Sequence, residues 1–334
     1  MKALVYEGPR ILEMREVAVP AIKPDEVLIR VEVAGICGSE LGGFLGHNSL
    51  RKPPLIMGHE FSGQIAEVGA AAGQFTIGER VTANPLATCG SCRYCRNGAS
   101  QLCERRSLLG AHRPGAFADY VAVPARNVYR LPDQVSYAEG AFTEPFACAV
   151  HICRLLAMKP TDRIIIYGAG PIGLFALQAA QVYGVRQAVV ADLNEARLEI
   201  ARELGAIAVT DPQLAADLPE DGFDAAIDAV GAEVTRQKCV QAVRRGGKVL
   251  FTGLHEAESK LPINDMIRSE VATYGAFAYS DDDFETALAW IAQGRVNLLP
   301  WTKTEPLADG QACFERLIAG PGKIAKYLLQ IGAV

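Results

Sequence analysis

The sequence predicts an α/β protein that combines a doubly wound parallel sheet with a second, mainly β, domain. Residues up to about 130 carry short β-branched or alternating runs that are separated by Gly and Pro. Between about residues 161 and 277, strand-like apolar runs alternate with helix-like runs, as in a parallel sheet with helices on both faces. One apolar run, Arg163–Tyr167, ends in the glycine-rich hexapeptide 168–173 and leads directly into a helix-forming stretch.

Taken in order, the first segment predicts strands at 2–6, 12–17, 26–33, 63–68, 79–83 and 118–124, then a helix over 142–156 whose first turn holds Pro145. The alternating segment predicts strands at 163–167, 187–192, 223–229, 248–253 and 271–278. Its helices are expected after residue 173, over 194–204 and over 233–243. The tail predicts an amphipathic helix over 282–293 and short elements that return to the first domain. We therefore expect one domain of residues 1–146 and 278–334 and another of residues 147–277.

Composition and charge exclude several classes of protein. The chain has 334 residues, half of them apolar, which is enough for two domains with large cores. Its net charge is −5 and it has no basic tail, which argues against nucleic acid or an anionic membrane as partner. The first residues lack a secretory apolar segment, and the longest apolar stretch is broken by glycines and Pro171. We expect a cytoplasmic protein.

The glycine-rich turn predicts a dinucleotide site. Gly168 permits the tight turn, Gly170 lets backbone N–H groups approach a pyrophosphate, and Gly173 lets the helix pack closely on the strand. The next strand ends in Asp192, whose carboxylate can accept both ribose hydroxyls and would repel a 2′-phosphate, so NAD is expected. The alternative is a glycine-bearing turn without a ligand. The candidate nucleotide-binding residues are Gly168, Gly170, Pro171, Ile172, Gly173, Asp192, Gly231 and Gly253.

Four of the nine cysteines fall within fifteen positions, as Cys89-x2-Cys92-x2-Cys95-x7-Cys103. Four thiolates at this spacing make a closed tetrahedral zinc site, which has no open coordination position. We expect this zinc to be structural. The alternatives are a loop of free thiols, disulfides, or a zinc ribbon for nucleic acid, and the acidic balance of the chain disfavours the last.

Cys37, His59 and Glu144 are further candidate metal ligands. Each also has a simpler interpretation: Cys37 as a small buried apolar residue, His59 as a turn residue, and Glu144 as an acid at a helix N-terminus. The spacing does not show that they converge. If they do, the set leaves a fourth position open, as a catalytic zinc requires.

Six motifs together identify a family. They are G-I-C-G-S at 35–39, G-H-E-x2-G-x5-G at 58–69, the four-cysteine lobe, G-A-F-A-D-Y at 115–120, E-P at 144–145 and G-A-G-P-I-G at 168–173. Over its whole length the chain resembles the zinc-containing medium-chain dehydrogenase/reductase family. The Glu-Pro pair in place of a cysteine is similar to the polyol branch of sorbitol, butanediol and galactitol-1-phosphate dehydrogenases.

The resemblance implies a GroES-like catalytic domain and a Rossmann cofactor domain. It implies hydride transfer between NAD and a secondary alcohol of a polyol or sugar alcohol, with or without a phosphate group, and two Zn²⁺ ions per chain. The implied catalytic residues are the ligands Cys37, His59 and Glu144, with Glu60 as a further or alternating ligand, and Ser39 as the hydroxyl that passes on the substrate proton. Arg197 is similar to the basic residue that the family places near the ribose.

The chain departs from its relatives at two positions. Gly42 occupies the position where related alcohol and sorbitol dehydrogenases carry a histidine that continues the proton relay, and Glu40 replaces the more common aspartate. The resemblance also implies a homodimer or homotetramer, for which the edge strand at 271–278 is the candidate pairing surface. The alternatives are a dehydrogenase of simple secondary alcohols or of amino alcohols such as threonine, and a non-catalytic nucleotide-binding protein with a structural or sensing role.

Overall fold

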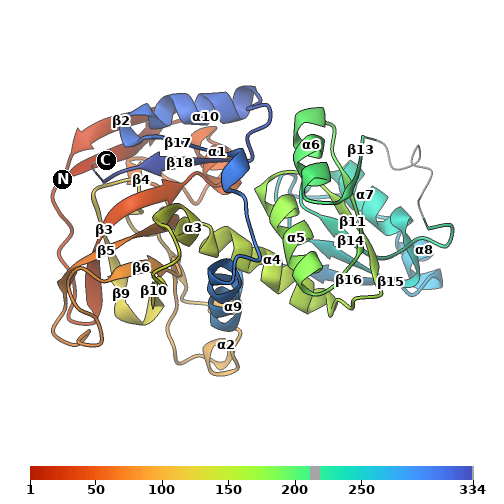
Figure 1. Ribbon diagram of the computed structural model, residues 1–334, viewed down its shortest axis with the longest axis horizontal. Helices are drawn as coiled ribbons and strands as arrows, with labels where there is room; N and C mark the ends of the chain where they lie inside the picture. Colours follow the sequence, from red (N-terminus) through yellow and green to blue (C-terminus); the bar gives the residue numbers. More distant parts are fainter. Residues whose placement is uncertain (211–218, 333–334) are drawn as a thin grey trace. The chain divides into compact units, whose positions relative to one another are not determined.

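The computed structural model describes residues 1–210 and 219–332, which form two compact units (Figure 1). Unit 1 comprises Met1–Glu144 and Ser280–Val334, and unit 2 comprises Pro145–Tyr279. Each of these boundaries lies two residues from the boundary that the sequence predicts. No helix in the described part of the chain is long and apolar enough to cross a membrane.

Unit 1 is built on a seven-stranded sheet in the order β10-β6-β5-β3-β18-β17, with β9 also pairing with β3. The strands β3 (Glu26–Gly35) and β5 (Glu60–Val68) form an antiparallel pair inside this sheet. The C-terminal strand β18 pairs antiparallel with β3, so the tail returns to the sheet of the first residues. The remaining strands are β6 (Arg80–Ala83), β9 (Tyr120–Pro124), β10 (Val128–Arg130), β17 (Thr302–Pro306) and β18 (Lys326–Gln330).

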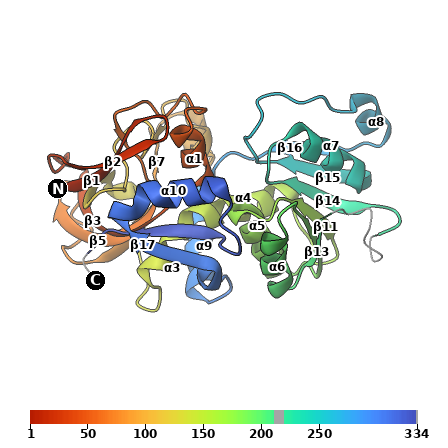
Figure 2. The same cartoon turned by 90° about the horizontal axis from the view of Figure 1, so that it is seen from above.

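Helix α10 holds α1 in place through aromatic packing. The ring of Phe314 in α10 lies 5.2 Å from that of Phe44 in α1 and 6.2 Å, edge-on, from that of Phe117. Figure 2 shows α10 beside α1 and β17. The unit also contains a three-stranded sheet, β2-β1-β4, and the pair β7-β8. Its other elements are β1 (Lys2–Gly8), β2 (Ile11–Glu16), β4 (Leu55–Ile56), β7 (Leu86–Ala87), β8 (Ser107–Leu108), α1 (Gly38–Phe44), α2 (Arg93–Arg96), α3 (Tyr137–Ala141), α9 (Asp281–Ala292) and α10 (Gly310–Ala319).

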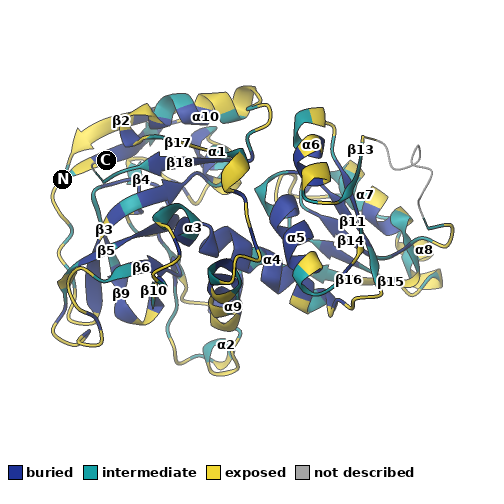
Figure 3. Ribbon diagram, in the orientation of Figure 1, coloured by how far each residue is buried: buried dark blue, intermediate teal, exposed yellow. Residues whose placement is uncertain are grey.

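Unit 2 is a six-stranded, all-parallel sheet in the order β13-β12-β11-β14-β15-β16. In chain order this is 3-2-1-4-5-6, the doubly wound Rossmann arrangement that the sequence predicts. Strands β11, β12 and β14 are almost wholly buried, which explains their largely apolar sequences (Figure 3). The elements are α4 (Thr143–Leu156), which begins in unit 1, β11 (Arg163–Tyr167), α5 (Pro171–Val182), β12 (Gln187–Ala191), α6 (Glu195–Glu203), β13 (Ile207–Val209), β14 (Phe223–Asp228), α7 (Glu233–Ala242), β15 (Val243–Phe251), α8 (Ile263–Arg268) and β16 (Ala272–Gly275).

Strand β15 and helix α1 are among the elements that differ from the prediction. Strand β15 begins at Val243, five residues before the predicted start, because Gly246 takes a φ of +69° and lets the strand continue through an irregular register. Helix α1 is absent from the prediction, since its sequence G-S-E-L-G-G-F is rich in glycine. The side chain of Glu40 supports the start of this helix by accepting a hydrogen bond from the Cys37 N–H, 3.0 Å away.

Candidate functional site

Cys37 lies in the short link between β3 and α1, where the chain leaves the large sheet of unit 1. It is the N-cap residue of α1 and keeps an extended backbone, with φ −89° and ψ 149°. At Gly35, two residues earlier, an added Cβ would overlap the carboxylate of Glu60 and the side chain of Lys326. The glycine in this motif therefore lets two charged side chains lie directly beside the Cys37 link.

His59 is oriented by Glu40, which is fully buried. The Glu40 Oε1 atom lies 2.7 Å from His59 Nδ1 and accepts the Gly58 N–H at 2.8 Å. Because Nδ1 is taken by this contact, Nε2 is the ring atom left for a ligand, the usual arrangement behind a metal-binding histidine. Glutamate, which stands here in place of the more common aspartate, thus reaches the His59 ring with its longer side chain.

The charges around this pair shift both pKa values. Burial opposes the ionisation of Glu40, but the charges of His59 and Arg51 and the hydrogen bonds to His59 and Cys37 outweigh it, so the pKa of Glu40 is lowered. Burial likewise opposes protonation of His59, yet the negative charges of Glu40 and Cys37 raise its pKa well above 6.5. A divalent cation would satisfy the same excess of negative charge that draws a proton to this ring.

Glu60 is the first residue of β5 and forms an ion pair with Lys326 of β18. Both side chains are about 1 % exposed. The Lys326 Nζ also donates a hydrogen bond to the Ile36 carbonyl oxygen at 3.1 Å. Burial opposes the charge on Lys326, but the charges of Glu60, Cys37 and Glu144 outweigh it and raise its pKa, so the lysine stays protonated.

Cys37, His59 and Glu60 each place one ligand atom within 4.8 Å of the others. A thiolate, an imidazole nitrogen and a carboxylate oxygen are the donors that zinc takes in proteins, so the chemistry of this set fits the metal. Glu144 lies outside this group of three; it is buried in the first turn of α4, and its charge acts on Lys326. Ser39 is exposed, and its Oγ lies 3.3 Å from Cys37 Sγ.

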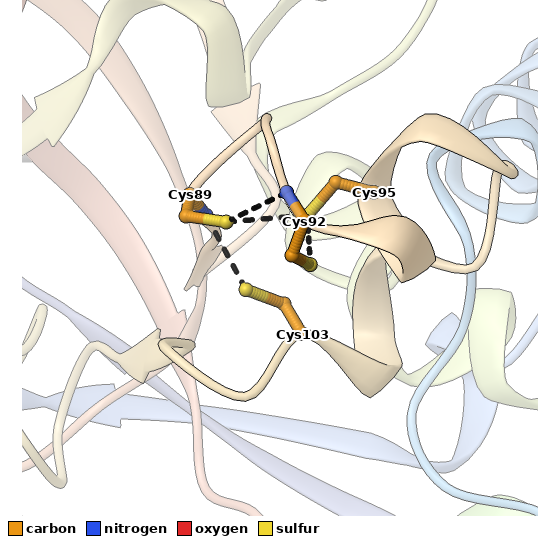
Figure 4. Close-up of side chains that lie close together, drawn as sticks. All are labelled: Cys89, Cys92, Cys95 and Cys103. Carbon is orange, nitrogen blue, oxygen red and sulfur yellow. Dashed lines mark hydrogen bonds between the residues drawn. The ribbon is translucent and has the colours of Figure 1, made fainter.

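The four cysteines of the lobe converge in the same unit (Figure 4). The Sγ atoms of Cys89 and Cys95 are 3.9 Å apart, and those of Cys92 and Cys95 are 3.5 Å apart. Four sulfurs at about 2.3 Å from one tetrahedral ion lie roughly 3.8 Å from each other, so the spacing fits zinc. Backbone N–H groups of Ser91 and Cys92 lower the pKa of the Cys89 thiol to about 5. All four cysteines are free of disulfides, as metal ligation requires.

The glycine-rich turn lies between β11 and α5 of unit 2. Gly168 has a φ of +106°, and a Cβ on Gly173 would overlap the Gly168 carbonyl oxygen, so both positions require glycine for the turn itself. A Cβ on Gly170, the N-cap of α5, would meet no protein atom within 4 Å. Pro171 and Ile172 begin the helix. The space in front of Gly170 and the helix N-terminus suit an anionic ligand.

Asp192 follows β12 and braces this turn. Its Oδ2 accepts the Ala169 N–H at 2.7 Å, and its Oδ1 accepts the Asn194 N–H at 2.8 Å. Arg197 is half-buried in the first turn of α6. The sequence predicts the carboxylate at this place, but not that it is already hydrogen-bonded to the glycine turn.

The loops that contain Gly231 and Gly253 touch each other, since a Cβ on either would overlap the backbone of the other. Asp228, which the sequence analysis missed, organises both loops. Its buried Oδ1 accepts hydrogen bonds from Gly231 N–H at 2.9 Å and Thr235 Oγ1 at 2.9 Å, and Gly253 N–H donates to its backbone carbonyl at 3.1 Å. The sequence signal that could have identified Asp228 is an acidic residue at the end of a buried strand, shortly before Gly231.

Comparisons with known proteins agree with both units. Residues 23–133 match the alcohol dehydrogenase GroES-like domain, and residues 171–293 match the zinc-binding dehydrogenase domain. The chain is 35 % identical to a sorbitol dehydrogenase of Bacillus subtilis over 311 residues, which cover 89 % of this chain and 87 % of the relative. It is 35 % identical over 342 residues to an L-threonine 3-dehydrogenase of Rhizobium etli, covering 97 % of each. A solved alcohol dehydrogenase of Escherichia coli CFT073, in complex with NADH, is 28 % identical with a TM-score of 0.92 over 99 % of both chains.

Proposed function

The chain belongs to the zinc-containing medium-chain dehydrogenase/reductase family, and from this membership we propose that it interconverts a secondary alcohol of a polyol or sugar alcohol and the corresponding ketone with NAD. The observation that carries the proposal is the convergence of Cys37, His59 and Glu60 beside an exposed hydroxyl. A non-catalytic nucleotide-binding protein would have no use for a metal centre with an open position.

The proposed ligands are Cys37, His59 and Glu144, with Glu60 as an alternating ligand. When bound, the zinc supplies Lewis acidity at the substrate oxygen, and the NAD accepts the hydride. The ion pair with Lys326 balances the charge of Glu60. The proposed role of Glu40 is to fix the His59 ring through Nδ1.

Ser39 accepts the proton that leaves the substrate hydroxyl, because its exposed Oγ lies next to Cys37. Gly42 has no side chain to take that proton further, so water takes it. In unit 2, the proposed contacts are the pyrophosphate with the turn around Gly170 and the adenosine ribose with Asp192, with Arg197 nearby. Gly231 and Gly253 offer backbone groups to the rest of the cofactor.

A panel of alcohols tests the substrate class. The purified protein would be assayed with NAD on sorbitol and other polyols, inositols and sugar phosphates, and on short secondary alcohols and L-threonine. We expect the highest kcat/KM on a polyol or a sugar phosphate. The second candidate is an amino-alcohol dehydrogenase, which the likeness to the threonine enzyme favours, and a preference for L-threonine would establish it. The absence of turnover on every alcohol, together with one zinc per chain in place of two, would favour a non-catalytic role.

Asp192 is expected to give NAD a preference over NADP of more than about tenfold, since its charge repels a 2′-phosphate by roughly 1.4 kcal/mol or more. In Asp192→Ala this preference should narrow, through a lower KM for NADP and a higher KM for NAD. Asp192→Asn is the matched control, because its amide oxygen can still accept one of the two backbone hydrogen bonds. Equal kcat/KM for the two cofactors in the unaltered protein would contradict the proposed role.

A cytoplasmic location and a homodimer or homotetramer remain predictions. The location is supported by free thiols at all nine cysteines. The assembly is supported by the exposed edge strand β16. Size-exclusion chromatography with light scattering measures the assembly directly.

A further inference from the structure

Arg51 is a buried cation that lies outside the six motifs of this chain. It lies between α1 and β4 with a relative exposure of 4 %, in the same unit as the candidate metal ligands. Its side chain fits against α1 because residue 43 is glycine: a Cβ there would overlap the Arg51 Cδ. Burial of a guanidinium is costly unless its charge is used, so this placement requires an explanation.

The Arg51 guanidinium donates a hydrogen bond from Nη2 to the Ser39 Oγ at 3.0 Å. The Ser39 Oγ in turn lies 3.3 Å from Cys37 Sγ. The arginine therefore faces the one hydroxyl to which the proposed function gives a role in proton transfer. The charge is partly balanced by the buried Glu40, whose carboxylate feels the Arg51 charge.

The chemistry of the two groups fixes the direction of this hydrogen bond. Arginine has only donors and stays protonated, so Ser39 must be the acceptor. A hydroxyl has one donor hydrogen and two acceptor lone pairs. In the structure one lone pair of Ser39 is held by Arg51 and its hydrogen is directed at Cys37 Sγ. The second lone pair is therefore the one left to accept the substrate hydroxyl.

The same contact bears on the missing relay residue. At position 42 the chain has glycine, and a Cβ there would lie 3.9 Å from the Asn48 Cβ, an ordinary contact. Space does not exclude a side chain at this position. The side chain that contacts Ser39 is that of Arg51, nine residues further along the chain; it orients the hydroxyl and does not carry the proton further.

We propose that Arg51 is a positioning residue that fixes the Ser39 hydroxyl for proton transfer. The inference rests on the proposed function. In alcohol oxidation the substrate O–H bond breaks and its proton passes to Ser39, whose own proton leaves to water, while the hydride passes to NAD. Arg51 neither gains nor loses a proton in this sequence.

A double-mutant cycle tests the pairing of Arg51 with Ser39. The variants are Arg51→Met, Arg51→Lys, Ser39→Ala and the combination of Arg51→Met with Ser39→Ala, each assayed on the best alcohol substrate. We expect Arg51→Met to lower kcat about 30-fold with little change in the KM for NAD, and Arg51→Lys to restore most of the loss. In the Ser39→Ala background, Arg51→Met should change kcat less than about threefold. If the fold-reductions in kcat of the two single variants multiplied in the double variant, the two residues would act independently and the proposal would be overturned.

A second readout needs no turnover. After removal of zinc, Cys37 would be alkylated with iodoacetate, which is anionic, or with iodoacetamide, which is neutral, and its peptide quantified by mass spectrometry. Both reagents react with the same Cys37 thiolate, so a change in the reactivity of the thiol cancels when one rate is divided by the other. A unit charge about 6 Å away alters the rate for the anion roughly threefold in water-like surroundings. The rate with iodoacetate divided by the rate with iodoacetamide should fall by about that factor in Arg51→Met. The same ratio should stay constant in Arg51→Lys and Ser39→Ala. An unchanged ratio in Arg51→Met would contradict the placement of the charge.

Folding and the proposed function are controlled separately. The thermal midpoint, zinc content and NAD binding of each variant show whether Arg51→Met is folded, and Arg51→Gln replaces it if it is not. If the unaltered protein prefers threonine or a simple alcohol, the polyol proposal fails while the cycle is still run on that substrate. If no alcohol is oxidised, both the proposed function and the role of Arg51 in proton transfer are wrong, whatever the alkylation ratio.

Discussion

Replacing His59 by alanine is expected to abolish turnover while NAD binding survives. The imidazole supplies one donor of the candidate metal centre in unit 1, whereas the glycine turn that is proposed to hold the nucleotide belongs to unit 2. Loss of the metal removes the Lewis acid, so kcat should fall on the order of 10³-fold or more. Zinc measured by atomic emission should fall from two ions per chain to one, because the four-cysteine lobe is untouched.

The control for this substitution is His112→Ala. His112 is an exposed histidine of the same unit. Its Nδ1 accepts a hydrogen bond from the Leu108 N–H, 3.2 Å away. We expect this variant to keep both zinc ions and nearly full activity. Retained activity in His59→Ala, or two zinc ions in the inactive protein, would rule out the assigned metal centre. A loss of NAD binding with a large drop in thermal midpoint would indicate unfolding, and His59→Gln would then be compared.

The parts of the sites that the sequence predicts are those whose spacing is local. The cysteines of the lobe fall within fifteen positions, and the glycine turn is defined by the strand before it and the helix after it. In both cases a particular residue type is required at a fixed distance along the chain. The lobe requires thiolates for its ligands, and the turn requires glycine at position 168, where φ is +106°. The resemblance to a known family adds the expectation that Cys37 and His59 meet.

The surroundings of the metal centre depend on contacts that are distant in sequence. Lys326 reaches the Ile36 carbonyl oxygen across 290 residues of chain, because β18 pairs with β3. The sequence around this lysine predicts an ordinary β-strand, and nothing in it indicates that Glu60 is its partner. In the sequence Arg51 stands beside Lys52 as an ordinary basic pair, and only the tertiary structure shows that Arg51 is buried against Ser39. Buried charges of this kind are recognised by their partners, which a linear pattern does not contain.

The glycine turn yields the second large effect, through two neighbouring substitutions with opposite consequences. Gly173→Ala places a Cβ where the Gly168 carbonyl oxygen lies, so α5 must move away from β11. Overpacking of this kind costs about 1–3 kcal/mol, and we expect the thermal midpoint to fall by roughly 5 °C or more. Gly170→Ala meets no protein atom within 4 Å and has an allowed φ of −77°, so its midpoint should stay within about 2 °C.

Gly170→Ala should nevertheless weaken NAD binding at least about tenfold, because the added methyl group occupies the space in which the backbone would approach the pyrophosphate. Binding would be measured by calorimetry with NAD and, as a smaller ligand, with adenosine, whose affinity should change little because it lacks the pyrophosphate. The zinc content of both variants should remain two per chain. If Gly170→Ala bound NAD as tightly as the unaltered protein, the pyrophosphate would not lie at this helix N-terminus. The presence of glycine at position 170 would then be unexplained, since the fold leaves room for a larger side chain there.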